Sequence, residues 1–210
     1  SIKNFLLQNG LGIMGSFNPK EKYQNLLKSR TILLVGPNEP YFWEIFIKSE
    51  EYKDGESHPL DRWSKRVIEK IAIKENTQVY FPFDKNEIWP FYSWALECSE
   101  MSESPIKLLV HNKKGLFLSF RGAIGLDFKI KDKRKTEGVC KTCHKPCITS
   151  CPVSALTPKG YNVKKCKEYL VSTEGKECKK GCLVRRSCPF GSKLRLPKQS
   201  EFHMKEFIKS

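Results

Sequence analysis

"CKTCHKPCITSCPVSAL", residues 140–156, contains four cysteines in its first twelve residues, and proline follows the last of them. A second stretch, KECKKGCLVRRSCP (176–189), contains three more and also ends in Cys-Pro. Cys166 lies between the two stretches, so eight of the nine cysteines fall between positions 140 and 188. The use of these eight thiols decides how this part of the chain folds.

Two sets of four cysteines in an intracellular chain are typical of metal ligands. In the bacterial ferredoxin pattern, the cysteine before proline binds the other of two [4Fe-4S] clusters, so that two runs interlock. Two zinc sites and a disulfide framework are the alternatives. Two zinc sites would not account for two Cys-Pro ends or for the closely spaced first run, and no visible signal peptide supports a disulfide framework. The spacing therefore favours two [4Fe-4S] clusters.

Exchange of the last ligand predicts which cysteines belong together. The first cluster would be bound by Cys140, Cys143, Cys147 and Cys188, and the second by Cys151, Cys166, Cys178 and Cys182. Three residues separate Cys143 from Cys147, where the simple ferredoxin run has two, and we interpret His144 in this insertion as a bystander. Cys98 lies far from the others and is expected to be a small buried apolar residue.

Composition limits the class of protein. The 210 residues carry a formal net charge of +15, with 30 lysines and only 8 arginines. A solvated lysine-rich surface explains this charge, while a polyanionic partner such as tRNA stays open as an alternative. No run of about 18 apolar residues is present, and the first residues do not resemble a secretory signal. We therefore expect a cytoplasmic protein with no membrane partner.

The residues before the cysteines alternate between helical and extended patterns. Strands are predicted at 31–37 and 77–83. Helices are predicted over 4–15, 39–52, 57–74 and from Pro90 onward, the third with a face made by Trp63, Val67, Ile68 and Ile71. Residues 105–124 are predicted to form a hairpin that turns at NKKG, with Gly115 supplying a positive φ. The sum is an α+β chain whose N-terminal α/β domain has a small mixed sheet.

The chain is expected to divide into three parts. KIKDKRKTEG (129–138) is polar, basic and without apolar periodicity, so it separates an N-terminal domain at 1–135 from a cysteine-rich domain at 136–195. The latter has few large apolar side chains, and we expect its metal to hold it together. Residues 196–210 are predicted to form a helical tail capped by Ser200.

The order of the segments GLFLSFRGAI, the basic linker, CKTCHKPCITSCPVSAL, KKCKEYLVSTEG and GCLVRRSCP resembles the middle of the epoxyqueuosine reductases. In that family a cobalamin-binding domain precedes a two-cluster ferredoxin domain. Over its full length, with LLVGPNEPYFW, HPLDRWSKRV and LPKQSEFHMKEF included, the chain is more similar to short bacterial 4Fe-4S "ferredoxin"-type proteins. These are distantly related to cobalamin-handling reductases, including the cblC-type cobalamin-processing proteins. The resemblance implies a nitroreductase-like N-terminal fold, a ferredoxin-like second domain and corrinoid binding.

One family feature is not preserved. The segment that carries the family's proton-donating aspartate corresponds here to FPFDKNEIWPFYSW (81–94), with a different spacing. Asp84 and Glu87 are interpreted as solvated surface carboxylates. Arg62 and Arg121 would either bind an anionic or amide group of a ligand or pair with carboxylates. The aromatic residues are interpreted mainly as core, with a flat cofactor pocket as the alternative: Tyr41, Phe42, Trp43, Trp63, Phe81, Phe83, Trp89, Phe91, Tyr92 and Trp94.

Three hypotheses follow. The first is an iron-sulfur redox protein that passes single electrons to a corrinoid or other cofactor, or to a substrate, at the N-terminal domain, with an acidic ferredoxin or flavodoxin as donor. In that case the chain would be a cobalamin-dependent or cobalamin-processing reductase. The second is a pure ferredoxin-like carrier that docks to a partner enzyme. The third, ranked below both, is a zinc-stabilised basic protein that binds nucleic acid.

Overall fold

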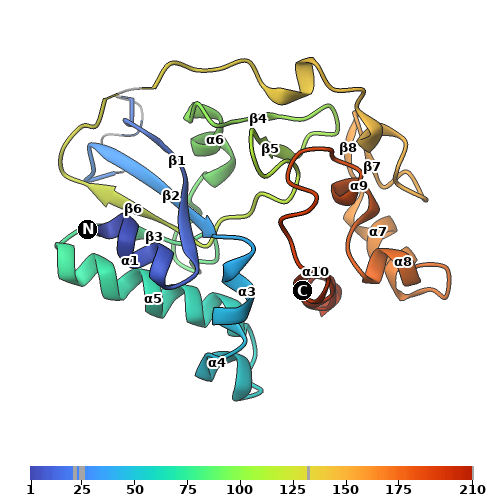
Figure 1. Cartoon of the computed structure of the whole chain (residues 1–210), viewed down its shortest axis with the longest axis horizontal. Helices are drawn as coiled ribbons and strands as arrows, with labels where there is room; N and C mark the ends of the chain where they lie inside the picture. The colour runs from blue at the N-terminus through green and yellow to red at the C-terminus, as the bar shows by residue number, and fades with distance from the viewer. Residues whose placement is uncertain (21–22, 24–26, 132, 210) are drawn as a thin grey trace. The chain divides into compact units, whose positions relative to one another are not determined.

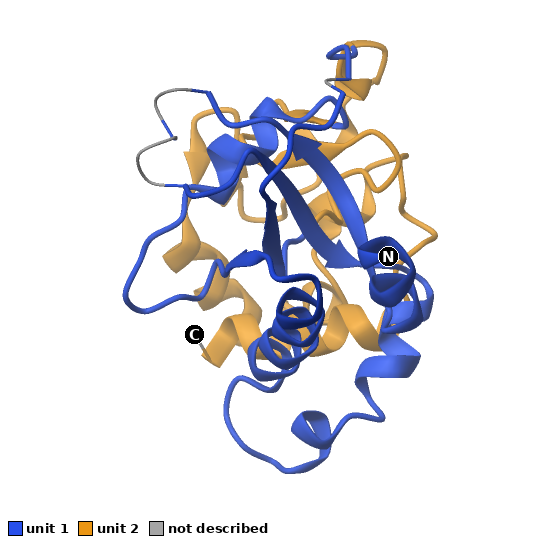
Figure 2. Ribbon diagram, turned by 90° about the vertical axis from the view of Figure 1, so that its left-hand side faces the viewer, with its two compact units in different colours: residues 1–100, 119–136 blue, residues 101–118, 137–210 orange. Residues whose placement is uncertain are grey.

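The computed structural model describes residues 1–20, 23, 27–131 and 133–209 (Figure 1). The chain forms two compact units (Figure 2). Unit 1 contains residues 1–100 and 119–136, and unit 2 contains residues 101–118 and 137–210. Sequence analysis places its main boundary after residue 135 and a second one before the tail at 196–210. The structure also changes unit after Thr136, but residues 101–118, from inside the expected N-terminal domain, belong to the same unit as the cysteines.

Unit 1 is built around one four-stranded sheet. Its strands are β1 (Leu11–Phe17), β2 (Thr31–Pro37), β3 (Gln78–Tyr80) and β6 (Gly122–Leu126), in the order β1-β2-β6-β3. Every neighbouring pair is antiparallel. The α+β class is therefore confirmed, but the predicted mixed sheet is wrong. β2 and β3 do run in the same direction, and β6 lies between them with the opposite direction.

Five helices are described in unit 1: α1 (Ile2–Gln8), α3 (Tyr41–Phe46), α4 (Glu50–Lys53), α5 (Pro59–Glu75) and α6 (Phe91–Glu97). The apolar face predicted for α5 is buried, as expected from its spacing. The helix predicted over 39–52 is interrupted at Ser49, whose hydroxyl accepts a hydrogen bond from the Tyr52 N–H and so begins α4. The aromatic run therefore forms two short helices.

The first predicted helix is too long. α1 ends at Gln8, Gly10 takes a left-handed φ of +71°, and Leu11–Phe17 forms β1. Apolar residues and glycines fit both patterns locally, and pairing with the fully buried β2 decides for the strand.

The predicted hairpin over 105–124 is also wrong. β5 (Leu109–His111) pairs backward with β4 (Met101–Glu103), while residues 122–126 form β6 in unit 1. The expected turn is present, because His111 and Gly115 are bridged and Gly115 has a φ of +56°. The chain turns there, but the second apolar run leaves for another sheet.

Unit 2 consists of short elements around the cysteines. After the β4-β5 pair come η1 (Val139–Lys141), η2 (Pro146–Ile148), β7 (Leu156–Thr157), β8 (Gly160–Tyr161), α7 (Val163–Val171), α8 (Lys176–Lys179), α9 (Leu183–Arg186) and α10 (Pro197–Lys209). α10 begins at Pro197, a favoured first helical residue. Ser200 is thus inside the helix and buried, so its predicted capping role is wrong.

Segment 101–118 supplies much of the apolar core of unit 2. Ile106, Val110 and Leu116 are almost completely buried and form one cluster with Cys147 and Cys188. The cysteine-rich stretch therefore has a core beyond its own side chains. Among the described helices, none is long and apolar enough to cross a membrane.

Candidate metal centre

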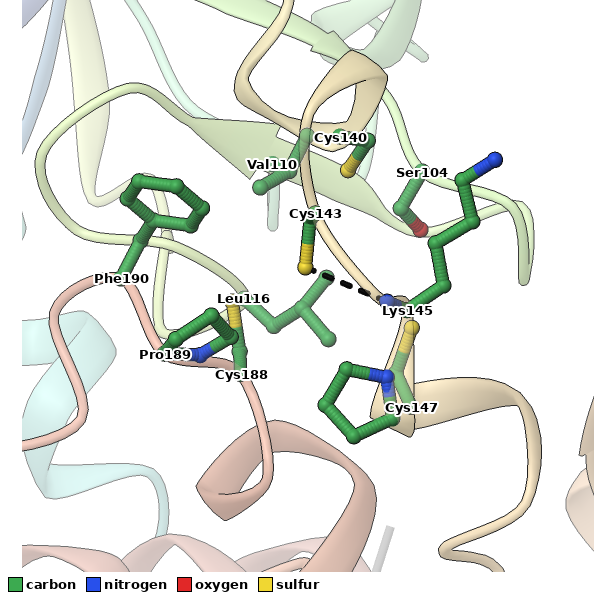
Figure 3. A pocket seen from close by; sticks show the side chains of 11 residues that line it. Ser104, Val110, Leu116, Cys140, Cys143, Lys145, Cys147, Cys188, Pro189 and Phe190 are labelled. Carbon is green, nitrogen blue, oxygen red and sulfur yellow. Dashed lines mark hydrogen bonds between the residues drawn. The ribbon is translucent and has the colours of Figure 1, made fainter.

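The four cysteines predicted to hold the first cluster line one pocket (Figure 3). Cys140 lies on η1, Cys147 lies on η2 and Cys143 lies between them, while Cys188 follows α9 from 41 positions beyond Cys147. Val110 and Leu116 of segment 101–118 complete the apolar wall. The pocket, which we call centre 1, thus joins three separate parts of unit 2.

The loop between Cys143 and Cys147 has a backbone that aims a donor at sulfur. Lys145 takes a left-handed φ of +57°, and its backbone N–H donates a hydrogen bond to Cys143 Sγ at 3.3 Å. Pro146 follows and begins η2, which places Cys147 toward the pocket. The extra residue in this loop therefore makes room for a tight turn around the Cys143 sulfur. His144, in the same insertion, is exposed.

The remaining four predicted ligands line a second pocket, which we call centre 2: Cys151, Cys166, Cys178 and Cys182. Cys166 is on α7, Cys178 is on α8 and Cys182 precedes α9. The backbone N–H of Ala155 donates to Cys151 Sγ at 3.1 Å. The hydroxyl of Tyr161 lies near the sulfur of Cys166.

The electrostatic neighbours of the thiols follow the same division. Burial, together with the nearby thiols of Cys147, Cys143 and Cys188, raises the pKa of Cys140 to about 11. Burial also raises the pKa of Cys178, with Cys182, Cys166 and Cys151 as the neighbours that add to it. Like charges at close range disfavour ionisation, so four thiolates gathered in this way need cations between them.

The donor set fits two clusters of four thiolate ligands each, with apolar walls and N–H donors directed at sulfur. Among the described residues, no three His, Cys, Asp or Glu side chains are close enough to hold one metal ion together. A site for one metal ion and a site for a four-iron cluster differ in geometry. Thiolates on one tetrahedral zinc lie about 3.8 Å apart, given a Zn–S bond of about 2.3 Å, whereas the four thiolates of a cubane bind four different irons.

Cys98 lies at the end of α6, outside both centres. Its side chain is fully buried, and its Sγ donates to the carbonyl oxygen of Trp94 at 3.5 Å. Burial raises the pKa of the thiol to about 12, with the carboxylates of Glu100 and Glu97 adding to the effect. The expectation of a buried apolar role for Cys98 is confirmed.

The polar residues singled out in unit 1 have structural partners or face solvent. Arg62 forms two hydrogen bonds with the carboxylate of Asp54, at 2.7 and 2.8 Å, and Arg121 donates to Asp61 at 2.9 Å. Of the two alternatives for these arginines, the structure shows carboxylate pairing. Asp84 and Glu87 are exposed.

Most of the aromatic side chains pack against one another. Phe42, Phe46 and Trp63 are buried and form contacts with ring centroids 5.5–5.7 Å apart. Tyr80, Trp89 and Trp94 form a second group. Tyr41 is instead 66% exposed and Tyr92 is 41% exposed. Core packing is thus the observed role of most of the set, and these two are the exceptions.

Sequence reasoning missed two features of the centres. Segment 101–118 looked like part of the N-terminal domain, because an apolar run does not indicate which core it will enter. Tyr161 had no signal beyond its position five residues before Cys166. Comparisons of the chain with protein-family models, with curated proteins and with solved structures find no match.

Proposed function

We propose that the chain is an iron-sulfur redox protein that carries two [4Fe-4S] clusters. One is held by Cys140, Cys143, Cys147 and Cys188, and the other by Cys151, Cys166, Cys178 and Cys182. The observation that supports this best is the gathering of the eight cysteines into two pockets of four. The cysteine before each proline lies with the three ligands of the other run, as ligand exchange requires.

Bound clusters of this type supply one-electron transfer at low potential. The protein's contribution is to set that potential and to exclude water. At centre 1, Val110 and Leu116 form an apolar wall and the Lys145 N–H donates to sulfur. At centre 2, the Ala155 N–H donates to sulfur and the Tyr161 hydroxyl lies near Cys166. Hydrogen bonds of this kind favour the more negative, reduced state.

The distribution of charge supports the same proposal. Unit 2 contains 19 of the 38 basic residues and 7 of the 23 acidic ones, which gives it a net charge of +12 out of +15. Eight thiolates with their clusters are a concentrated negative charge, and a surrounding excess of lysine and arginine lowers its electrostatic cost. The basic composition thus has a local role near the cysteines.

For the destination of the electrons we propose a corrinoid or other cofactor, or a substrate, bound by unit 1. The resemblance to a nitroreductase-like, cobalamin-handling domain supports this, and the chain would then be a cobalamin-dependent or cobalamin-processing reductase. One observation favours the second candidate, a pure carrier that docks to an enzyme: the arginines and most aromatic side chains of unit 1 are already engaged with one another. The acidic donor or acceptor would be of ferredoxin or flavodoxin type.

Metal analysis tests the cluster proposal. Protein purified without oxygen should contain about eight iron and eight sulfide per chain, with broad visible absorbance that dithionite bleaches. Stoichiometric zinc in a colourless protein would overturn it and revive the zinc-stabilised nucleic-acid hypothesis.

A cobalamin titration of the same preparation then separates the two redox candidates. A spectral change with saturable binding supports a corrinoid site, and no change with either oxidation state of cobalamin supports the carrier.

A further inference from the structure

Tyr161 links centre 2 to the surface of the protein. It ends β8, where it pairs with Leu156 of β7, a residue that lines centre 2 together with Cys166, and its hydroxyl lies near Cys166 Sγ. Its side chain is nevertheless 39% exposed, and its ring stacks on Phe207 of α10 with the centroids 6.3 Å apart and the planes inclined by 17°. One side chain therefore lies near a predicted ligand thiol and also reaches solvent.

The chain exposes apolar and basic side chains on both sides of Tyr161 in the sequence. Val163 is 43% exposed, and Lys159, Lys164 and Lys165 are exposed beside it in the chain. Within the described part of the chain, Lys159 and Lys165 form no ion pair, and Lys164 lies 4.0 Å from Glu168 in a solvated pair. We call Lys159, Tyr161, Val163, Lys164 and Lys165 the α7 face.

This composition fits a protein partner of opposite charge. Protein interfaces place aromatic and apolar side chains at the centre and charged ones at the rim. The charged residues of the α7 face are all lysines, and they belong to the unit that carries +12 of the net charge. A protein surface complementary to this face is therefore acidic.

The position of Tyr161 also indicates what kind of protein the partner is. A molecule that covers the Tyr161 ring lies next to a ligand of centre 2, and electron transfer needs this proximity. Binding of nucleic acid has no such requirement.

We propose that an acidic one-electron carrier protein docks on the α7 face, with Tyr161 at the centre of the contact. The inference rests on the proposed iron-sulfur function, because it assigns a partner to one of the two centres. It adds that centre 2, rather than centre 1, is the centre that faces this partner.

The test is a binding measurement on the iron-loaded protein, with oxidised flavodoxin as the probe. The variant Lys164→Glu/Lys165→Glu reverses two charges on the α7 face. Lys70→Glu/Lys74→Glu is its matched control, since both lysines are exposed on α5 of unit 1 and the net charge changes equally. At low ionic strength we expect the dissociation constant to rise at least about tenfold in the first variant and less than about twofold in the second. Tyr161→Ala should weaken binding at high salt as well, because its contribution is not screened.

Each of the remaining outcomes would contradict a specific proposal. Equal weakening in both double variants, or no binding of flavodoxin to the unaltered protein, would overturn the docking inference and leave the clusters in place. If the protein contains no iron after purification without oxygen, both proposals are overturned. If tRNA binds through Lys164 and Lys165 and flavodoxin does not, the face belongs to nucleic acid.

Discussion

Gly115 and Phe190 are in direct backbone contact: a Cβ atom at position 115 would overlap the carbonyl oxygen of Phe190 and lie 2.8 Å from Cys188 Sγ. Gly115 also has a φ of +56°, a backbone conformation that residues other than glycine rarely adopt. The turn after β5 and the loop that carries Cys188 therefore fit together because position 115 has no side chain.

Replacement of this glycine should disturb centre 1. We expect Gly115→Ala to lower the stability of unit 2 by about 2–3 kcal/mol more than its backbone strain alone, and to reduce the iron bound per chain. Gly55→Ala is the control, because Gly55 has a similar φ of +75° but a Cβ atom there would meet no other atom within 4 Å. Thermal unfolding and iron analysis of the two variants provide the comparison. Equal losses in both would show that the contact with Phe190 is unimportant.

Single Cys→Ser variants should separate into the two predicted ligand sets. Cys188→Ser is expected to alter the same cluster signal as Cys140→Ser, although Cys182 is its nearer neighbour in sequence. Cys182→Ser should alter the other signal, together with Cys151→Ser. Electron paramagnetic resonance of the reduced variants distinguishes the signals. A Cys188 variant that matches Cys182 would contradict the exchange of ligands.

Cys98 should be inert toward alkylation in the folded protein. With its pKa raised to about 12, the thiol is almost entirely protonated at pH 8, so iodoacetamide should modify it about a thousandfold more slowly than an ordinary cysteine. Mass spectrometry before and after unfolding in urea measures this. Rapid modification under native conditions would show that α6 opens readily.

Tyr161→Phe should lower the reduction potential of one cluster and leave the other unchanged. The Tyr161 hydroxyl lies near Cys166 Sγ, and loss of a hydrogen bond between them worth about 0.5–1.5 kcal/mol would correspond to roughly 20–60 mV for one electron. Tyr169→Phe is a close control, because Tyr169 also lines centre 2 but donates its hydroxyl hydrogen to the carbonyl oxygen of Glu174. Potentiometric titration of both variants tests this, and equal shifts would remove the specific role of Tyr161.

The ion pair between Glu51 and Arg66 should make unit 1 sensitive to acid. Hydrogen bonds from Arg66 hold the pKa of the Glu51 carboxyl below its ordinary value of 4.5. A lowered pKa in the folded state means that the pair stabilises above pH 4.5, and that this stability is lost as the pH falls through the lowered value. Glu51→Gln should cost roughly 1 kcal/mol at neutral pH and less in acid.

The matched control for this pair is Glu69→Gln, which removes a solvated pair with Lys65 at 3.8 Å. Urea unfolding at pH 7 and pH 3.5 should show a pH-dependent difference for the first variant and none for the second. A constant difference at both pH values would point to lost packing.

Short-range sequence patterns predicted α5 and β2 well. The buried face of α5 follows from the spacing of Trp63, Val67 and Ile68, and β2 follows from an apolar run that ends at Gly-Pro. The grouping of the cysteines also came from spacing, because proline after Cys151 and Cys188 indicates ligand exchange. It agrees with the two pockets, while the metal itself stays a prediction.

Choices between distant partners were not predictable from spacing. Leu109–His111 is followed by a turn and a second apolar run, so a local hairpin is the obvious pairing, yet β5 pairs with β4 and Ala123 joins Tyr80 and Leu34 in unit 1. The energies that decide this lie in burial against Cys147 and Cys188, more than 25 positions away. Gly125 likewise packs against Ser29, a residue that lies far earlier in the sequence.

Because each unit consists of two separate segments, the order of synthesis determines when each unit becomes complete. The polypeptide changes unit after Glu100, after Leu118 and after Thr136. On the ribosome, Ile106, Val110 and Leu116 emerge before any of the eight clustered cysteines, so the residues of the apolar wall of centre 1 are present before the thiols that pack against them. The sheet of unit 1, in turn, lacks β6, one of its two inner strands, until residue 126 has been added. Neither half can be obtained as one uninterrupted fragment, and a fragment that starts at residue 137 would have to load iron without that wall.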